Sequence, residues 1–390
     1  MPATLMRKSG WRVFVGALMV LVAQTAAAAG GFTVGQVMAD LNLPADAVAR
    51  LRHGEILHSD PQESSDRELG VGLTFLVQRP PAEVLKVFRT VVDLKADPHL
   101  SASVQIRGPG TPADFASLVL EPGGAAEANR YLAASPGDTL NLSADEIQAF
   151  NALASAGDDP KPQVEEQLKR LLLARYQAYV ERGLGGMAPY ERRSGPCEPS
   201  GELRRASEAA ASEAVRLLKQ HAPALQQLLL SYPQGKPPGL EEHFYWLRRD
   251  LDGRPNYTLR HRLAMPVGEI FAVADREFYV SHGYNTSQAF AGLIPVREGT
   301  VVVYRSRVST EQVAGFGSSI KKGIGRSVMA KQLTEIFERS RDSFQRNTGT
   351  RPPVLKRPKA HTESERRMDT DYDPDPIAGR LPEEVRSGSD

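Results

Sequence analysis

The sequence predicts an α+β fold, in which a curved antiparallel sheet is gripped by a long C-terminal helix and carries a large helical insertion. Strand-like patterns follow one another closely over residues 257–309, and one amphipathic helix is expected after them, at Ser327–Phe344. Residues 122–239 carry helical patterns instead. Strands that are grouped along the chain and separated from runs of helices are typical of an α+β architecture.

The N-terminal part of the α+β domain, residues 33–121, is expected to begin with one or two short helices over 33–52, which Gly54 ends. The segment Glu68–Arg79 then alternates between two faces, and its apolar face consists of Val71, Leu73, Phe75 and Val77. Alternation with a period of two is typical of a half-buried strand. We therefore predict the first long strand here.

A helix is expected directly after this strand, because Pro80-Pro81 ends the strand and Pro81 fits the first turn of a helix. Apolar residues continue on one helical face as far as Val92. Two further strands are predicted at Ser103–Arg107 and Phe115–Leu120, on either side of a Gly-Pro-Gly turn.

The helical insertion, residues 122–239, contains three predicted helical stretches. A short helix is expected at Ser143–Leu153, because its first residues, Ser-Ala-Asp-Glu, match a capping box. A longer helix is expected at Gln163–Arg182. The stretch Ser200–Tyr232 is predicted to be one helix or a broken pair, since Pro223 should kink or restart it.

Residues 240–345 should complete the α+β domain with a strand meander and the C-terminal helix. The predicted strands are Glu241–Arg249, Tyr257–Val267, Ile270–Tyr284, Gln288–Val296 and Thr300–Ser309. Asp252-Gly253 is a hairpin-turn signal between the first two. Before the last helix, Gly315–Gly325 is predicted to be a glycine-rich loop, either a mobile connector or a basic loop that binds anions.

This order of elements resembles the helix-grip arrangement of the START-like (Bet v 1, polyketide cyclase-like) superfamily. Strand Glu68–Arg79 with the following Pro80-Pro81-Ala82-Glu83-Val84 is similar to the opening strand and first helix of that superfamily, and Ser327–Phe344 is similar to its gripping helix. The long helical insertion departs from the usual compact pattern. The resemblance implies a sheet curved around an apolar pocket that holds a lipid or another hydrophobic molecule. The superfamily shares no catalytic signature, so the resemblance assigns no residue.

Candidate ligand-binding residues lie on the predicted strands of the meander. His261 shares a mainly apolar strand face with Tyr257, and His282 shares another with Tyr284. A histidine on such a face is either a polar anchor or acid/base group in a cavity, or a hydrogen-bonded structural residue. Our hypothesis is that both histidines line one cavity. The candidate residues are His261, His282, Tyr284, Tyr257, Tyr304 and Arg305.

The N-terminus has the pattern of an export signal. Basic residues precede the apolar run Val13–Ala23, which is short for a membrane span, and small residues follow it. We expect cleavage near Ala28 or Ala29 and a periplasmic or secreted protein, with an uncleaved anchor as the alternative. Cys197 is the single cysteine, which excludes an internal disulfide. Residues 346–390 are predicted to be a disordered tail.

The composition argues against several classes of function. The net charge of +1 lacks the basic excess of a nucleic-acid-binding protein. Gly-x-Ser-x-Gly, His-Glu-x-x-His and Cys-x-x-Cys are absent, so no catalytic residue, metal ligand or cofactor is predicted. The leading prediction is an exported protein that binds or carries a hydrophobic or lipid-like small molecule. The alternatives are a hydrolase- or cyclase-type enzyme that uses the cavity histidines, and a cell-envelope interaction module with a peripheral envelope contact.

Overall fold

The computed structural model describes residues 32–346 except 45, 91–96, 122–123, 138, 156–158, 213–221 and 316. The predicted leader and the predicted tail beyond residue 346 lie outside these residues. The chain divides into a unit of residues 1–343 and a second unit of residues 344–390, of which only the last turn of one helix, 344–346, is described. The account below concerns the first unit.

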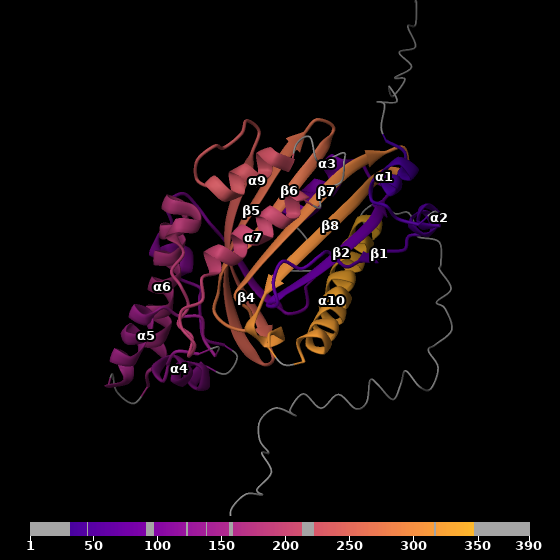
Figure 1. Cartoon of the computed structure of the whole chain (residues 1–390). Helices are drawn as coiled ribbons and strands as arrows, with labels where there is room; N and C mark the ends of the chain where they lie inside the picture. Colours follow the sequence, from indigo (N-terminus) through magenta and orange to yellow (C-terminus); the bar gives the residue numbers. More distant parts are fainter. Residues whose placement is uncertain are drawn as a thin grey trace, which may run out of the picture. The chain divides into compact units, whose positions relative to one another are not determined.

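The first unit contains one eight-stranded antiparallel sheet in the order β1-β2-β8-β7-β6-β5-β4-β3 (Figure 1). Its strands are β1 Leu57–Ser59, β2 Glu68–Val77, β3 Leu100–Ile106, β4 Glu241–Leu251, β5 Arg254–Val267, β6 Ile270–Val280, β7 Thr286–Val296 and β8 Gly299–Ser309. Strands β4 to β8 form a meander, and β8 returns to pair with β2 along its whole length. The predicted α+β class and antiparallel sheet are confirmed.

The helices are α1 Val34–Asp40, α2 Ala47–Arg52, α3 Pro81–Thr90, α4 Gly124–Leu132, α5 Ala144–Asn151, α6 Lys161–Arg182, α7 Pro199–Ser212, α9 Ala222–Ser231 and α10 Ser318–Arg346. Local sequence signals explain several boundaries. Pro81 begins α3, and the capping box at Ser143 begins α5. Asp252 and Gly253 both adopt positive φ between β4 and β5, as a tight hairpin turn requires. Within the described part of the chain, no helix combines the length and apolar character that a membrane span needs.

Two predictions of secondary structure are wrong. Residues Phe115–Leu120 are not a strand, because a 3₁₀ turn at Pro112–Phe115 precedes irregular chain. Phe115, Leu118 and Leu120 are buried without strand pairing, against the helices that follow. Residues 318–325, predicted to be loop, form the start of α10. Gly325 packs so closely there that a Cβ would lie 2.9 Å from a methyl carbon of Leu69.

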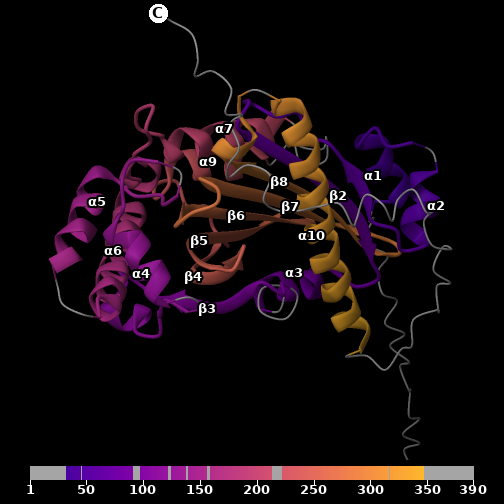
Figure 2. The same ribbon diagram turned by 90° about the horizontal axis from the view of Figure 1, so that it is seen from below.

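Both faces of the sheet are covered. We call one the α3/α10 face, because Val84 and Leu85 of α3 and Phe337 of α10 share a core with the odd-numbered apolar residues of β2. The other, the α6/α7 face, packs against α4 to α9 over β3–β6 and against α1 and α2 near β2, β7 and β8. Figure 2 shows α4, α5 and α6 gathered at the β3–β4 end of the sheet and α10 toward the opposite end.

This arrangement decides which layer covers each face of β5. Our hypothesis places His261 in a cavity, on the mainly apolar face that it shares with Tyr257. That face contacts α6 and α9, through the same core as Leu259 and Leu263. The physical reason is that the helices between β3 and β4 bury a second face of the sheet, so the most apolar face of a strand need not lie beneath α10.

Candidate functional site

The α3/α10 face is apolar where α3 and α10 cross β2, β8 and β7. Its buried sheet residues there are Leu73, Phe75, Val302, Leu293 and Ala291, which continue to Val273 of β6 and Ala264 of β5. From α10, Phe337 places its ring 4.9 Å from that of Phe75 and 4.9 Å from that of Tyr304. Phe88 of α3 lies 6.0 Å from Phe337, which closes this apolar cluster.

The same face becomes charged two residues further along β5 and β6. Next to Ala264 on this face comes Arg262, whose Nη2 lies 2.6 Å from Oδ2 of Asp275 on β6. Then comes Arg260, whose Nη2 lies 2.9 Å from Oε1 of Glu277. Successive positions on one face of a strand differ by two residues, so the apolar cluster and these ion pairs are direct neighbours.

Further groups extend the ion pairs into a network. Arg249 of β4 contacts Glu277 at 2.9 Å and Asp97 at 3.2 Å. Arg262 also donates to the main-chain oxygen of Phe88 at 2.6 Å, which ties the network to α3. Together with Arg260 and Asp275, the network holds three guanidinium groups and three carboxylates, so its formal charges balance.

Glu277 is the centre of this network. Burial alone raises its pKa, but the charges of Arg249 and Arg260 and the hydrogen bond from Tyr284 outweigh burial and lower the pKa of Glu277 to about 2. The Tyr284 hydroxyl donates to Glu277 Oε2 at 2.6 Å, and burial followed by the Glu277 charge raises the pKa of Tyr284. The carboxylate is therefore ionised and the phenol neutral at neutral pH.

Tyr304 stands at the boundary between the apolar and charged zones. Its ring packs edge-on against Phe337. Burial, and then the nearby carboxylate of Asp275, raise the pKa of Tyr304 to about 12. A hydroxyl in this position can offer a hydrogen bond to a polar group on a molecule whose apolar part contacts Phe337.

His261 lies on the opposite face and is held at both ring nitrogens. Nδ1 lies 3.1 Å from the Tyr179 hydroxyl of α6, and Nε2 lies 3.0 Å from Glu242 Oε1. Burial, only partly opposed by Glu242, lowers the pKa of His261 to about 4. The neutral ring then donates from Nε2–H to Glu242 and accepts from Tyr179, whose oxygen in turn accepts from Arg276 at 3.2 Å. These hydrogen bonds fix α6 on the sheet.

His282 lies elsewhere. Its Nε2 is 3.2 Å from the main-chain oxygen of Pro255, and burial lowers its pKa to about 4. Pro255 and His261 are six residues apart on β5, which corresponds to roughly 20 Å of strand. The two histidines therefore lie at separate positions along β5, and that they line one cavity stays a prediction.

The remaining predicted site residues divide between the two faces. Tyr284 and Tyr304 belong to the α3/α10 face. Tyr257 lies on the α6/α7 face, where its hydroxyl donates to the main-chain oxygen of Val119. Arg305 points to the same side, over Gly72, because neighbouring strand residues alternate in direction, and it cannot share a pocket with Tyr304.

Sequence reasoning missed the charged residues of the α3/α10 face: Arg249, Arg260, Arg262, Asp275 and Glu277. A signal for them existed. Arg260 and Arg262 alternate with the apolar residues of β5, and two acids with the same spacing, Asp275 and Glu277, occur on the next strand. Opposite charges at cross-strand positions indicate pairing.

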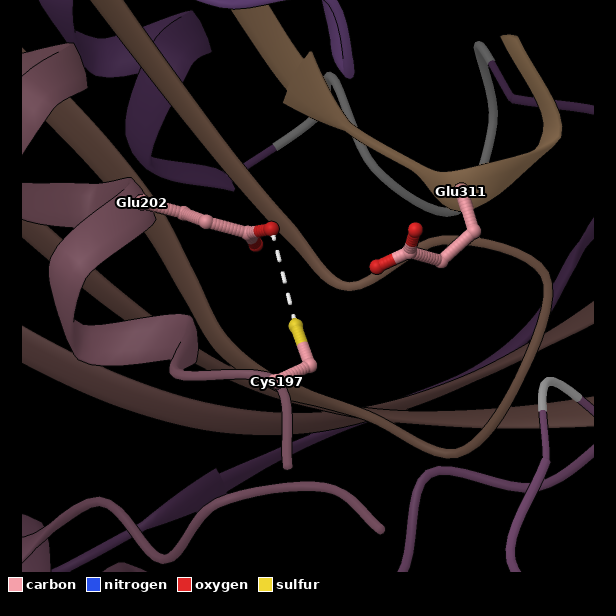
Figure 3. Close-up of side chains that lie close together, drawn as sticks. All are labelled: Cys197, Glu202 and Glu311. Atoms are coloured by element: carbon pink, nitrogen blue, oxygen red, sulfur yellow. Dashed lines mark hydrogen bonds between the residues drawn. The ribbon is translucent and has the colours of Figure 1, made fainter. Parts of the chain in front are cut away.

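One group of metal-type donors occurs among the described residues: Cys197, Glu202 and Glu311, whose ligand atoms lie within 4.8 Å of one another (Figure 3). Burial, and then Glu202, raise the pKa of Cys197 to about 12, and its thiol donates to Glu202 at 3.7 Å. Asn285 donates to the same carboxylate at 3.0 Å. Hydrogen bonds from Cys197 and Asn285 thus hold the carboxylate of Glu202, while Glu311 accepts from Arg67.

No family model matches the chain, and comparisons with curated proteins and with solved structures give no match.

Proposed function

We propose that the protein is an exported, periplasmic or secreted protein that binds or carries a hydrophobic or lipid-like small molecule between the sheet and helices α3 and α10. The observation that carries the proposal is the change from apolar to charged residues on one sheet face. Ala264 and Val273 are followed on that face by Arg262 and Asp275. An amphipathic ligand needs such a boundary, since its apolar part and its polar group prefer different surroundings.

The order of the elements supports the same proposal. Strand β2 precedes α3, the meander ends with β8 beside β2, and α10 follows β8. A helix-grip fold with the helices α4 to α9 as an insertion accounts for this order. In that fold, the long last helix would cover the ligand.

The packing of α10 supports ligand entry beneath it. Among its side chains that the structure describes, Phe337 is the one fully buried hydrophobic residue, while Met329, Ala330 and Leu333 are only partly buried. Segments with few buried apolar contacts belong to the less stable part of a fold, so we expect α10 to separate from the sheet more readily than the central strands separate from one another.

Specific roles follow for the residues of the boundary. Phe337 and Ala291 would contact the apolar part of the ligand, and Tyr304 would donate a hydrogen bond to its polar group. The balanced charges around Glu277 favour an uncharged polar group over a free anion, because the guanidinium groups already have carboxylate partners.

Native mass spectrometry of the full-length gene product, isolated from the periplasmic fraction of a bacterial host without detergent, tests the proposal. We expect a stoichiometric adduct of lipid-like mass that organic extraction removes. Protein that stays without an adduct after incubation with a bacterial lipid extract would contradict the proposed function.

A further inference from the structure

An exposed apolar stripe runs along the first half of α10. Ile320, Ile324 and Val328 expose 73%, 56% and 51% of their surface, and they are three of the four exposed large hydrophobic residues in the described chain. Their spacing of four residues places them in one line on the helix. The opposite side of α10 faces the sheet, since Met329, Leu333 and Phe337 pack against the core there. The stripe therefore points away from the core.

The same half of α10 is basic. Residues 318–334 contain Lys321, Lys322, Arg326 and Lys331 and no acidic residue. Cations near a helix N-terminus oppose the helix macrodipole, and Gly323 and Gly325 weaken the helix further. The basic residues and the glycines therefore do not stabilise α10, and their presence needs another explanation.

The carboxylate of Glu63 neutralises only part of the positive charge of these four side chains. Lys322 and Arg326 both contact Glu63, at 2.9 Å and 3.3 Å. Lys331 is exposed, and Lys321 is exposed with its ammonium near the main-chain oxygen of Ala314. Within the described ion pairs of residues 318–334, one carboxylate therefore faces two of the four cations. The stripe is flanked by net positive charge.

We propose that Ile320, Ile324 and Val328, together with Lys321 and Lys331, dock the protein on an anionic phospholipid membrane surface. The three aliphatic side chains enter the interfacial region of the bilayer, and the two lysines contact phosphate groups. This interaction goes beyond ligand binding under α3 and α10, which does not require it.

The size and charge of the stripe favour a membrane over a second copy of the chain. From residue 320 to residue 328 the helix rises about 12 Å, and a stable protein interface needs about 800 Å² from each partner. Two copies would also bring their lysines together. A lipid surface supplies opposite charge and requires only shallow insertion of a few side chains.

Vesicle co-sedimentation of the full chain after export tests the proposal. Vesicles of phosphatidylcholine with about 30% phosphatidylglycerol should bind the protein, vesicles of phosphatidylcholine alone should not, and about 0.5 M salt should weaken binding. Combined Ile320→Ser, Ile324→Ser and Val328→Ser substitutions should reduce binding at least tenfold. Lys321→Gln with Lys331→Gln should reduce both binding and its dependence on salt.

Val119→Ser, at the other exposed hydrophobic residue, is the matched control and should bind like the wild type. All variants change exposed side chains, so thermal unfolding should confirm that they fold. Absence of wild-type binding to anionic vesicles, or equal binding by the triple serine variant, would overturn the proposal. So would light scattering that shows a dimer which the triple variant disrupts. Ligand adducts in the triple variant should equal those of the wild type, so a failure here is distinct from a failure of the proposed ligand site.

Discussion

Tyr179 on α6 donates its hydroxyl hydrogen to Nδ1 of His261 on β5, with 3.1 Å between oxygen and nitrogen. This hydrogen bond joins the helices between β3 and β4 to the centre of the sheet. The His261 ring is also stacked on Phe244, with 4.3 Å between ring centroids. The histidine therefore stabilises the junction of two layers, while the ligand site that we propose lies on the other side of the same strand.

Replacement of Tyr179 by phenylalanine should destabilise the protein by about 1–3 kcal/mol, because His261 and Arg276 each lose a buried hydrogen-bond partner. A double-mutant cycle with His261→Gln should give a coupling energy of about 1 kcal/mol. Urea unfolding measures it. The matched cycle uses Tyr176→Phe on the same helix, whose hydroxyl bonds to Gly108 instead. Equal coupling in both cycles would contradict a specific Tyr179–His261 interaction.

The stability of the protein should depend on pH through His261. Its pKa is about 4 in the folded protein and 6.5 ordinarily, so the unfolded chain binds more protons between these values. The stabilisation is complete above pH 6.5 and is lost as the pH falls toward 4. From pH 7.5 to pH 5, His261 should account for about 2 kcal/mol of the decrease in unfolding free energy.

Urea unfolding at the two pH values checks this dependence. In His261→Gln, the unfolding free energy should decrease by about 2 kcal/mol less between the two pH values than in the wild type. The pKa of His282 is lowered in the same direction, so the contribution of His282 to the decrease should remain in this variant. The exposed His99→Gln variant is the control and should retain the wild-type dependence. An unchanged pH profile in His261→Gln would count against a neutral, buried imidazole.

The local features of the fold were predictable, because local sequence determines them. The start of α3 at Pro81, the capping box at Ser143 and the turn at Asp252-Gly253 each depend on a few neighbouring residues. The start of α10 was not predictable. Gly323 and Gly325 favour a loop by propensity, and the helix there depends on the contact of Gly325 with Leu69, a residue distant in sequence.

The site was predictable only in part for a related reason. The alternation of side chains along β5 correctly predicts that His261 and Arg260 lie on opposite faces of the sheet. It does not tell which layer covers each face, since that depends on where α6 and α10 pack. Tyr284 and Tyr304 were identified among the residues of the α3/α10 face, whereas the search for candidates on mainly apolar strand faces directed attention away from Arg260 and Arg262.

Glu277→Gln should destabilise the protein by about 3 kcal/mol or more, because Arg249 and Arg260 would lose the charge that compensates them. The pKa of Glu277 is about 2, below its ordinary 4.5, so its contribution is present above pH 4.5 and is lost as the pH falls toward 2. The variant should lack this part of the acid transition. Glu338→Gln, on the exposed side of α10, is the control and should unfold like the wild type in guanidinium. Similar stability of the two variants would contradict the central role of Glu277.

The most direct test of a ligand between the sheet and α3/α10 compares two buried alanines on opposite faces. Ala291 lies between Val273 and Tyr304 on the α3/α10 face, and Ala274 lies in the core beneath the helices of the α6/α7 face. Replacement of either by leucine should cost about 1–3 kcal/mol through overpacking. Native mass spectrometry of both variants should show a several-fold smaller adduct in Ala291→Leu and a wild-type adduct in Ala274→Leu. Equal adducts in both variants, or a larger loss in Ala274→Leu, would contradict a ligand site on the α3/α10 face.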